Sequence, residues 1–281
     1  MIRMQYLGTG AAEGFPGVFC ECPACLKARA IGGKNIKMRS CTLLNDHILI
    51  DMSPDLFAQG LRWNVTLSQI DHLVITHSHR DHLDPYLLYT RMKPGATILP
   101  ENSSGKRRFQ IWCSPQAQEA VNVGITVESG ADWDYFRCHA IHLGERVSVG
   151  ELTFIPLRAV HKKDELCYIY AITDGTKNLL YANDTGSLPD ETFSAMIDTG
   201  MQFDVVSMDC ARGILPGDGH MGLEENRKMK ERLFEIGAAT EKTRFYLNHF
   251  SHMCGLTHDE FQPLAASYGF TVAWDGLNIN V

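Results

Sequence analysis

The sequence has no long hydrophobic run. Nowhere among its 281 residues does an uninterrupted apolar stretch approach the ~20 residues that a membrane-spanning helix needs. The opening segment, MIRMQYLGTG, also lacks the apolar core and the small-residue cleavage site of a signal peptide. We therefore expect a cytoplasmic protein with no membrane partner.

Positive charge is also scarce. The chain has 26 Lys and Arg residues against 33 Asp and Glu residues, and its formal net charge is -7. A protein that binds nucleic acid generally needs a basic surface for the phosphate backbone. We therefore expect no nucleic-acid partner. A small anionic substrate stays open, because bound cations can dominate the field of a site.

Internal repeats and low-complexity tracts are absent as well. Hydrophobic residues make up 44% of the chain and charged residues 21%, which is enough to bury a substantial core. Short β-branched and apolar runs alternate with helical patterns, and two sheets with helices outside them are the simplest packing for this order. We expect one α/β domain over residues 1–281. The sequence leaves the oligomeric state open, a homodimer included.

The segment THSHRDHLDP contains four candidate metal ligands, His77, His79, Asp81 and His82, directly after an apolar run. In extended chain the side chains of His77 and His79 point to the same side. Asp81 and His82 follow in what we expect to be a turn. The segment can therefore offer two imidazoles to one cation, and a carboxylate with an imidazole to a second. Such ligands suit Zn, Mn and Fe, whereas a solvated polar turn is the plain alternative.

Further polar residues stand where other strand-like runs end. They are His161, Asp184, Asp209 and His249. Loops at strand ends, held by a rigid sheet, are common places for functional sites. We therefore treat this set as candidate site residues.

The H-x-H-x-D-H spacing of THSHRDH resembles the signature of the metallo-β-lactamase superfamily. That resemblance implies a four-layer αββα sandwich with a two-metal site. It implies seven ligands, which this sequence fills in order with His77, His79, Asp81, His82, His161, Asp184 and His249. In the implied arrangement one ion is held by His77, His79 and His161, the other by Asp81, His82 and His249, and Asp184 bridges them. Asp81 also counts as a catalytic candidate, and Asp51 resembles the aspartate that fixes the tautomer of a ligand histidine.

Three cysteines, Cys20, Cys22 and Cys25, form a C-x-C-x-x-C cluster in GVFCECPACLKAR. In a cytoplasmic protein this spacing predicts a zinc knuckle rather than disulfides. A structural zinc ion needs four ligands. His252 is the best candidate for the fourth, and Cys254 is the alternative.

The knuckle and the early GTGAAEGFP segment together resemble one branch of the superfamily, the PhnP-like cyclic phosphodiesterases that assist the carbon–phosphorus lyase. A protein of pyrroloquinoline quinone biosynthesis shares a similar start, so the knuckle alone does not decide the branch. The resemblance to the phosphodiesterases also gives a role to His220 in LPGDGHMGLEEN, which would contact the substrate phosphate and protonate the leaving oxygen. A loop histidine that only caps the following helix is the alternative.

Charge counting shows why such a site suits a phosphodiester. Two divalent ions, Zn or Mn, bring four positive charges, and Asp81 and Asp184 return two negative ones. The surplus matches one hydroxide and one phosphodiester monoanion in an in-line displacement. We expect a phosphodiesterase that hydrolyses a small, cyclic substrate such as a ribose or nucleoside cyclic phosphate. A tRNA 3′-processing nuclease, an iron-dependent oxygenase and an accessory protein of quinone biosynthesis stay open as alternatives.

Overall fold

The computed structural model describes residues 1–92, 94–97, 108–129, 133–217 and 219–281. In these residues two seven-stranded sheets lie face to face, with strand orders β14-β1-β2-β3-β4-β5-β6 and β13-β12-β11-β10-β9-β8-β7. The first sheet consists of β1 (Arg3–Gly8), β2 (Cys41–Leu44), β3 (Ile48–Ile50), β4 (His72–Val74), β5 (Phe109–Cys113), β6 (Phe136–Ala140) and β14 (Asn278–Asn280). The second consists of β7 (Val147–Val149), β8 (Leu152–Arg158), β9 (Tyr168–Thr173), β10 (Asn178–Ala182), β11 (Val205–Asp209), β12 (Arg244–Asn248) and β13 (Phe270–Val272).

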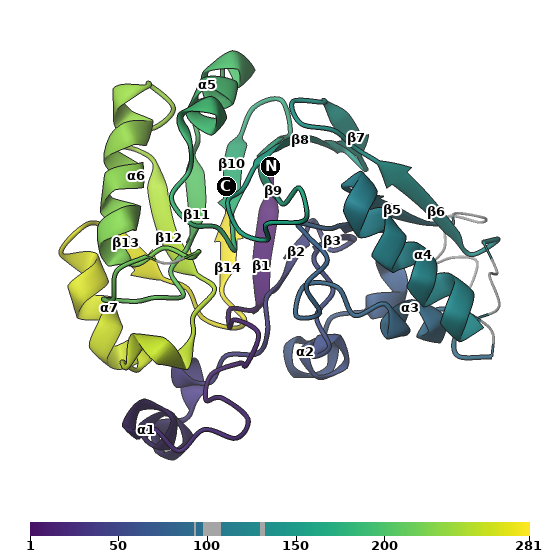
Figure 1. Cartoon of the computed structure of the whole chain (residues 1–281), viewed down its shortest axis with the longest axis horizontal. Helices are drawn as coiled ribbons and strands as arrows, with labels where there is room; N and C mark the ends of the chain where they lie inside the picture. Colours follow the sequence, from purple (N-terminus) through teal and green to yellow (C-terminus); the bar gives the residue numbers. More distant parts are fainter. Residues whose placement is uncertain (93, 98–107, 130–132, 218) are drawn as a thin grey trace.

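Helices cover the outer face of each sheet (Figure 1). The second sheet carries α5 (Asp190–Thr199), α6 (Leu223–Glu235) and α7 (His258–Ala266). The first sheet carries α2 (Leu56–Trp63), α3 (Tyr86–Thr90) and α4 (Pro115–Ser129). The remaining helix, α1 (Pro23–Ile31), lies below the sandwich in this view and belongs to the cysteine-rich segment. The predicted α/β class and the four-layer αββα sandwich are confirmed.

Alternation along the strands explains the layers. Successive side chains of a strand point to opposite faces of its sheet. In β10, Leu179 and Tyr181 therefore join the core between the two sheets, whereas Leu180 and Ala182 join the core under α5, α6 and α7. Both faces of the strand are apolar, which is typical of a strand buried on both sides.

Two hairpin turns use residue types that tolerate positive φ. Asn45 and Asp46 both adopt positive φ between β2 and β3, and Gly175 does so between β9 and β10. Serine followed by proline is a preferred pair at helix starts, so Ser53 and Pro54 favour a helix that begins at Pro54 with Ser53 as its cap. The helix begins at Leu56 instead, because the Ser53 hydroxyl donates to the side chain of Gln59 and does not cap the helix.

Among the described residues, none of the helices has the length and apolar character needed to cross a membrane.

Candidate metal centre

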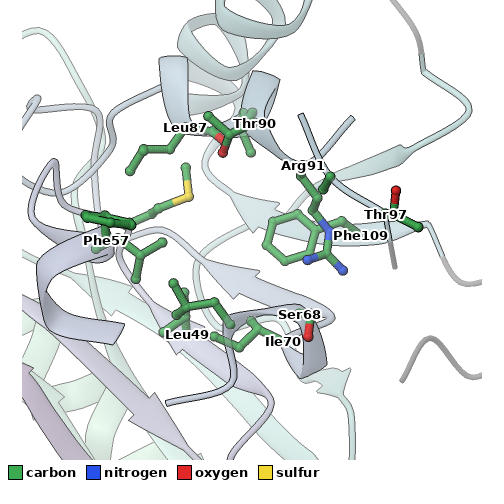
Figure 2. A pocket seen from close by; sticks show the side chains of 14 residues that line it. Leu49, Phe57, Ser68, Ile70, Leu87, Thr90, Arg91, Thr97 and Phe109 are labelled. Atoms are coloured by element: carbon green, nitrogen blue, oxygen red, sulfur yellow. The ribbon is translucent and has the colours of Figure 1, made fainter. Parts of the chain in front are cut away.

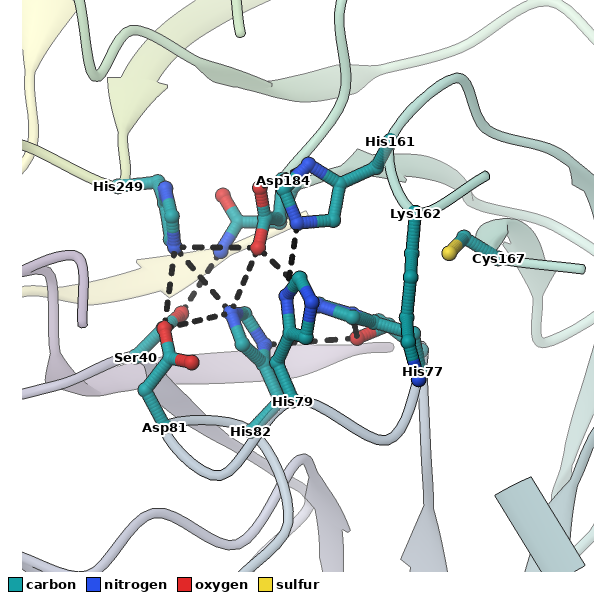
Figure 3. A network of polar contacts seen from close by, with 12 residues as sticks. Ser40, His77, His79, Asp81, His82, His161, Lys162, Cys167, Asp184 and His249 are labelled. Carbon is teal, nitrogen blue, oxygen red and sulfur yellow. Dashed lines mark hydrogen bonds and ion pairs between the residues drawn. The ribbon is translucent and has the colours of Figure 1, made fainter. Parts of the chain in front are cut away.

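The candidate ligands meet at one edge of the sandwich, where strands of both sheets end (Figure 3). The loop after β4 carries His77, His79, Asp81 and His82 from the first sheet. Three loops of the second sheet supply the remainder, namely His161 after β8, Asp184 after β10 and His249 after β12. The structure therefore brings together all seven residues that the sequence pattern selects.

Three residues of this edge have strained backbone conformations. Asp51, Asp184 and His249 have φ values of 64°, 52° and 59°. Positive φ is uncommon for residues other than glycine and costs on the order of 1–3 kcal/mol, so it persists only where the surrounding structure enforces it. Each of these residues directly or closely follows a strand, and the sharp turn aims its side chain at the centre.

One group of four donors consists of His77, His79, His161 and Asp184. The donor atoms of the group lie within 4.8 Å of one another. Nδ1 of His79 is 2.9 Å from Nε2 of His161, and Nε2 of His77 is 3.3 Å from a carboxylate oxygen of Asp184.

A second group consists of Asp81, His82, Asp184 and His249, all buried. Nε2 of His82 lies 3.2 Å from Nε2 of His249, 3.3 Å from Asp81 and 3.1 Å from Asp184. Asp184 belongs to both groups, and also to a third with Asp209, His220 and His249, so its carboxylate lies where the groups meet.

The donor set fits divalent metal ions. A tetrahedral ion with ~2.0–2.1 Å bonds to nitrogen or oxygen holds neighbouring donors about 3.3 Å apart, close to the separations found here. Nε2 of His77 and Oδ1 of Asp184 are buried and have no hydrogen-bond partner among the described residues. Buried polar atoms are rarely left unpaired, and a bound cation would satisfy both.

Carboxylates behind the ligands fix the orientation of two histidine rings. Asp51 accepts a hydrogen bond from Nδ1 of His82 at 2.7 Å, which leaves Nε2 of that ring facing the cation group. Asp209 lies 3.2 Å from Nδ1 of His249, an ion-pair distance, and places a second carboxylate behind that ring. Such partners set the tautomer of a ligand histidine and raise its basicity.

Burial and neighbouring charges keep the imidazole of His161 neutral. Burial lowers the pKa of His161 to about 4, helped by repulsion from His77 and His220 and opposed by Asp184. A neutral imidazole has the free electron pair that a metal ligand requires. His161 is therefore available as a ligand at neutral pH.

His220 lies inside the same centre, although it is not one of the seven ligands. Its Nδ1 is 3.0 Å from Asp184 and 3.1 Å from Asp209. Burial lowers its pKa, but the contacts with these two carboxylates outweigh burial and raise the pKa to about 10. The ring also lines a cavity of about 190 Å³ together with Glu13 and Met253.

The cysteine cluster forms a further group of donors, separate from the histidine–aspartate centre. Sγ of Cys20 is 3.2 Å and Sγ of Cys22 is 3.8 Å from Nδ1 of His252, and Cys25 completes the four donors. The contact with His252 is the largest effect that lowers the pKa of Cys22, to about 6. A low thiol pKa favours the thiolate, which is the form that binds zinc.

The choice between the two candidates for the fourth knuckle ligand follows from a short turn. Residues His252–Cys254 form a 3₁₀ turn after Ser251, and His252 faces the thiols while Cys254 donates to the carbonyl of Leu256. Cys254 is buried beside Gly213 and takes no part in the cluster. The cluster therefore contains His252.

The sequence pattern assigns no role to two residues beside the centre. Asp209 ends a strand and was visible as a strand-end candidate, but the pattern assigns it no role. Glu165 gave no signal, because its partners are distant in sequence. Its carboxylate accepts a hydrogen bond from the backbone N–H of Ser78 at 2.8 Å and another from Lys162 at 2.9 Å, between the loops that carry the metal ligands.

Comparison with known proteins agrees with this geometry. A family model described as the beta-lactamase superfamily domain matches residues 46–250, well over half of the chain. The chain belongs to the metallo-β-lactamase superfamily. The family match and the histidine–aspartate centre together make it a metal-dependent hydrolase.

Several superfamily proteins are similar over their whole length. Coenzyme PQQ synthesis protein B of Acinetobacter baumannii is 22% identical over 327 residues, which cover 100% of both chains. The crystal structure of a diphosphatase from the PhnP family has a TM-score of 0.75 at 23% identity and covers 99% of this chain and 96% of its own. The short form of human tRNase Z has a TM-score of 0.63 at 14% identity, with 99% of both chains covered. These likenesses show a shared fold.

Proposed function

We propose that this hydrolase is a dinuclear phosphodiesterase that acts on a small, cyclic phosphodiester such as a ribose or nucleoside cyclic phosphate. The observation that carries the proposal is the position of Asp184, whose carboxylate is shared by both groups of four donors that contain the seven candidate ligands. His77, His79 and His161 would hold one divalent ion, Asp81, His82 and His249 the other, and Asp184 would bridge them. A Zn or Mn pair in this position supplies a hydroxide nucleophile and polarises the phosphoryl oxygens.

The size and charge of the centre support a small substrate. The cavity beside the ligands is about 190 Å³, which accommodates a phosphate ester with a compact leaving group. Asp81 and Asp184 place two negative charges among the seven ligands, so two divalent ions leave a surplus of two positive charges. A hydroxide and a phosphodiester monoanion together would neutralise that surplus.

His220 is placed to act on the leaving group. Its Nδ1 faces Asp184 and Asp209, so Nε2 is the nitrogen that can reach a substrate in the cavity. If Nε2 donated a proton to the departing oxygen, the leaving group would depart as a neutral alcohol rather than as a strongly basic alkoxide.

The cysteine cluster would hold a structural zinc ion apart from this chemistry. Its donors, Cys20, Cys22, Cys25 and His252, leave no open position for a substrate. The ion would tie the segment before α1 to the loop that follows His249.

A substrate screen with metal-loaded protein tests the proposal. We expect cyclic ribose and nucleoside phosphates to be hydrolysed faster than linear dinucleotides, and Asp184→Ala to reduce turnover to background. Asp190→Ala is the matched control, because the Asp190 carboxylate is 95% exposed on α5 and should leave the rate unchanged. Faster cleavage of a tRNA precursor, oxygen uptake with an iron-loaded sample, or no turnover of any diester by fully metal-loaded protein would each contradict the proposal.

A further inference from the structure

A second cavity lies on the far side of the first sheet from the core between the sheets. It opens between α2, α3 and the outer face of β3 and β5, and its volume of about 450 Å³ exceeds that of the cavity at the metal centre. Figure 2 shows the side chains of Phe57, Leu49 and Leu87 around its open middle. With the exception of a few polar side chains its walls are apolar.

Arg91 is the one cationic side chain among the described lining residues. Its guanidinium lies over the ring of Phe109, 4.4 Å from the ring centre, on the opposite side of the cavity from Phe57 (Figure 2). Burial lowers the pKa of Arg91 to about 10, and the charge of Asp71 offsets part of that effect. Within the described residues the guanidinium forms neither a hydrogen bond nor an ion pair, although it carries five N–H donors.

An apolar chamber with one unsatisfied guanidinium has the chemistry of a site for an amphipathic anion. The volume falls within the range of about 300–1,000 Å³ that is typical of small-molecule pockets, which are mostly apolar and carry a few placed polar groups. An anionic head would meet the donors of Arg91, and an apolar tail would cover the walls that Leu49, Phe57 and Leu87 form.

We propose that this cavity binds a medium-chain acyl anion, with its tail between α2 and α3 and its head on Arg91. Charge complementarity selects this occupant over a neutral lipid, because a neutral head leaves the guanidinium without an acceptor. The same complementarity selects it over an apolar peptide or a second copy of the chain. The site is separate from the metal centre and stands independently of the phosphodiesterase activity.

Calorimetric titration of the metal-loaded full chain with decanoate, decyl phosphate, decanol and acetate tests the proposal. We expect one decanoate or one decyl phosphate to bind per chain. The affinities of these two ligands show whether the cavity prefers a carboxylate or a phosphate head group. Decanol, which lacks the charge, should bind about tenfold more weakly, and acetate, which lacks the tail, should not bind at this cavity. Equal affinities for decanoate and decanol would overturn the proposal, as would the absence of saturable binding.

Three variants locate the binding. Arg91→Met should weaken decanoate binding about tenfold and leave decanol binding unchanged, since it removes the charge but keeps an apolar side chain. Arg62→Met is the matched control, because Arg62 lies over Trp63 on α2 and does not line the cavity. Ser68→Phe fills the chamber and should abolish binding of both decanoate and decanol.

The filled variant also separates the cavity from the metals. Decanoate that still binds Ser68→Phe protein would be held at the metal centre, and the proposal would be wrong. A dimer of the unmodified chain that dissociates in Ser68→Phe protein, measured by sedimentation, would show that a second copy covers the cavity and would equally overturn it.

Discussion

The carboxylate of Asp51 lies 2.7 Å from Nδ1 of His82, and both side chains are fully buried. The same carboxylate accepts a hydrogen bond from the backbone N–H of Thr76 at 2.8 Å, one residue before His77. Asp51 therefore fixes both the ring of one candidate ligand and the start of the loop that carries four of them.

Asp51→Asn should weaken cation binding chiefly at the group of Asp81, His82 and His249. An amide cannot accept from His82 and Thr76 as a carboxylate does, and loss of such a partner typically costs 10–100-fold in metal affinity. Competition titration with Zn or Mn measures the two affinities. Asp55→Asn is the control, because Asp55 contacts Arg39 and lies outside the centre. Equal weakening of both cation sites would contradict the assignment.

Glu165→Gln should loosen the loops that carry His77, His79 and His161. The amide supplies one acceptor where the carboxylate supplies two, and it places N–H groups against the N–H of Ser78 or the ammonium of Lys162. A buried donor left unsatisfied costs ~1–3 kcal/mol, which should appear as a lower melting temperature and weaker binding of one cation. Glu191→Gln, on the exposed side of α5, should change neither quantity.

Cys22→Ala should release the zinc of the knuckle and lower the melting temperature before it affects turnover. The binding energy of a structural zinc ion is partly folding energy. Zinc content and thermal unfolding measure the two effects together. Cys167→Ala is the control, because Cys167 is buried elsewhere and should leave the zinc in place. Lost turnover with unchanged zinc and stability would show that the knuckle is misassigned.

His220→Ala should slow hydrolysis of a cyclic ribose phosphate by ~10²–10⁴, the usual contribution of a general acid, and slow an aryl phosphodiester far less. An aryl oxide departs without a proton, whereas an alkoxide needs one. Steady-state rates for both substrates and the metal content decide the matter. Equal losses on both substrates would indicate phosphate positioning, and a lost metal ion would make His220 a ligand.

Asp275 makes stability depend on pH in a direction opposite to that of most carboxylates. Burial raises its pKa from 3.8 to about 6, although Lys37 and the hydrogen bonds from Thr9 and Met38 lower it. The folded chain therefore keeps a proton that the unfolded chain has already lost. This contribution is fully present below pH 4 and is lost as the pH rises through about 6, for a total of roughly 3 kcal/mol.

Asp275→Asn should flatten that part of the stability profile. Urea unfolding between pH 4 and 7 measures the free energy of unfolding of both proteins. In the difference between these two free energies, the effects of groups that titrate alike in both proteins cancel. The difference should change across this window because only the unmodified chain titrates at position 275. Parallel profiles would contradict the raised pKa.

The distance along the chain explains which parts of the centre the sequence could predict. His77, His79, Asp81 and His82 are contiguous, so their spacing alone indicates a metal site. Asp184 and His249 could be found because they close apolar strands. Glu165 could not, because its partner Ser78 lies 87 residues away and no local pattern marks a lysine-rich turn as buried.

The backbone conformation could be predicted from sequence only where the residue type by itself favours one conformation. Asn45 and Asp46 tolerate positive φ, so the hairpin turn that they form can be predicted from the sequence. The start of α2 was not, because Ser53 has both a capping role and a hydrogen bond to Gln59 available to it. Tertiary contacts decide between two such local options.

Two hydrogen bonds connect the sheets next to the metal loop. The hydroxyl of Tyr170 donates to the carbonyl of Ile75 at 2.6 Å, and the backbone N–H of Tyr168 donates to that of Thr76 at 2.9 Å. A cut between β6 and β7 would leave four of the seven candidate ligands on one fragment and three on the other, so both groups that contain these seven residues would be divided. Fragments that are expressed separately should then bind each other more tightly when zinc is present than when a chelator removes it. Zinc binding would therefore report whether the two fragments have assembled.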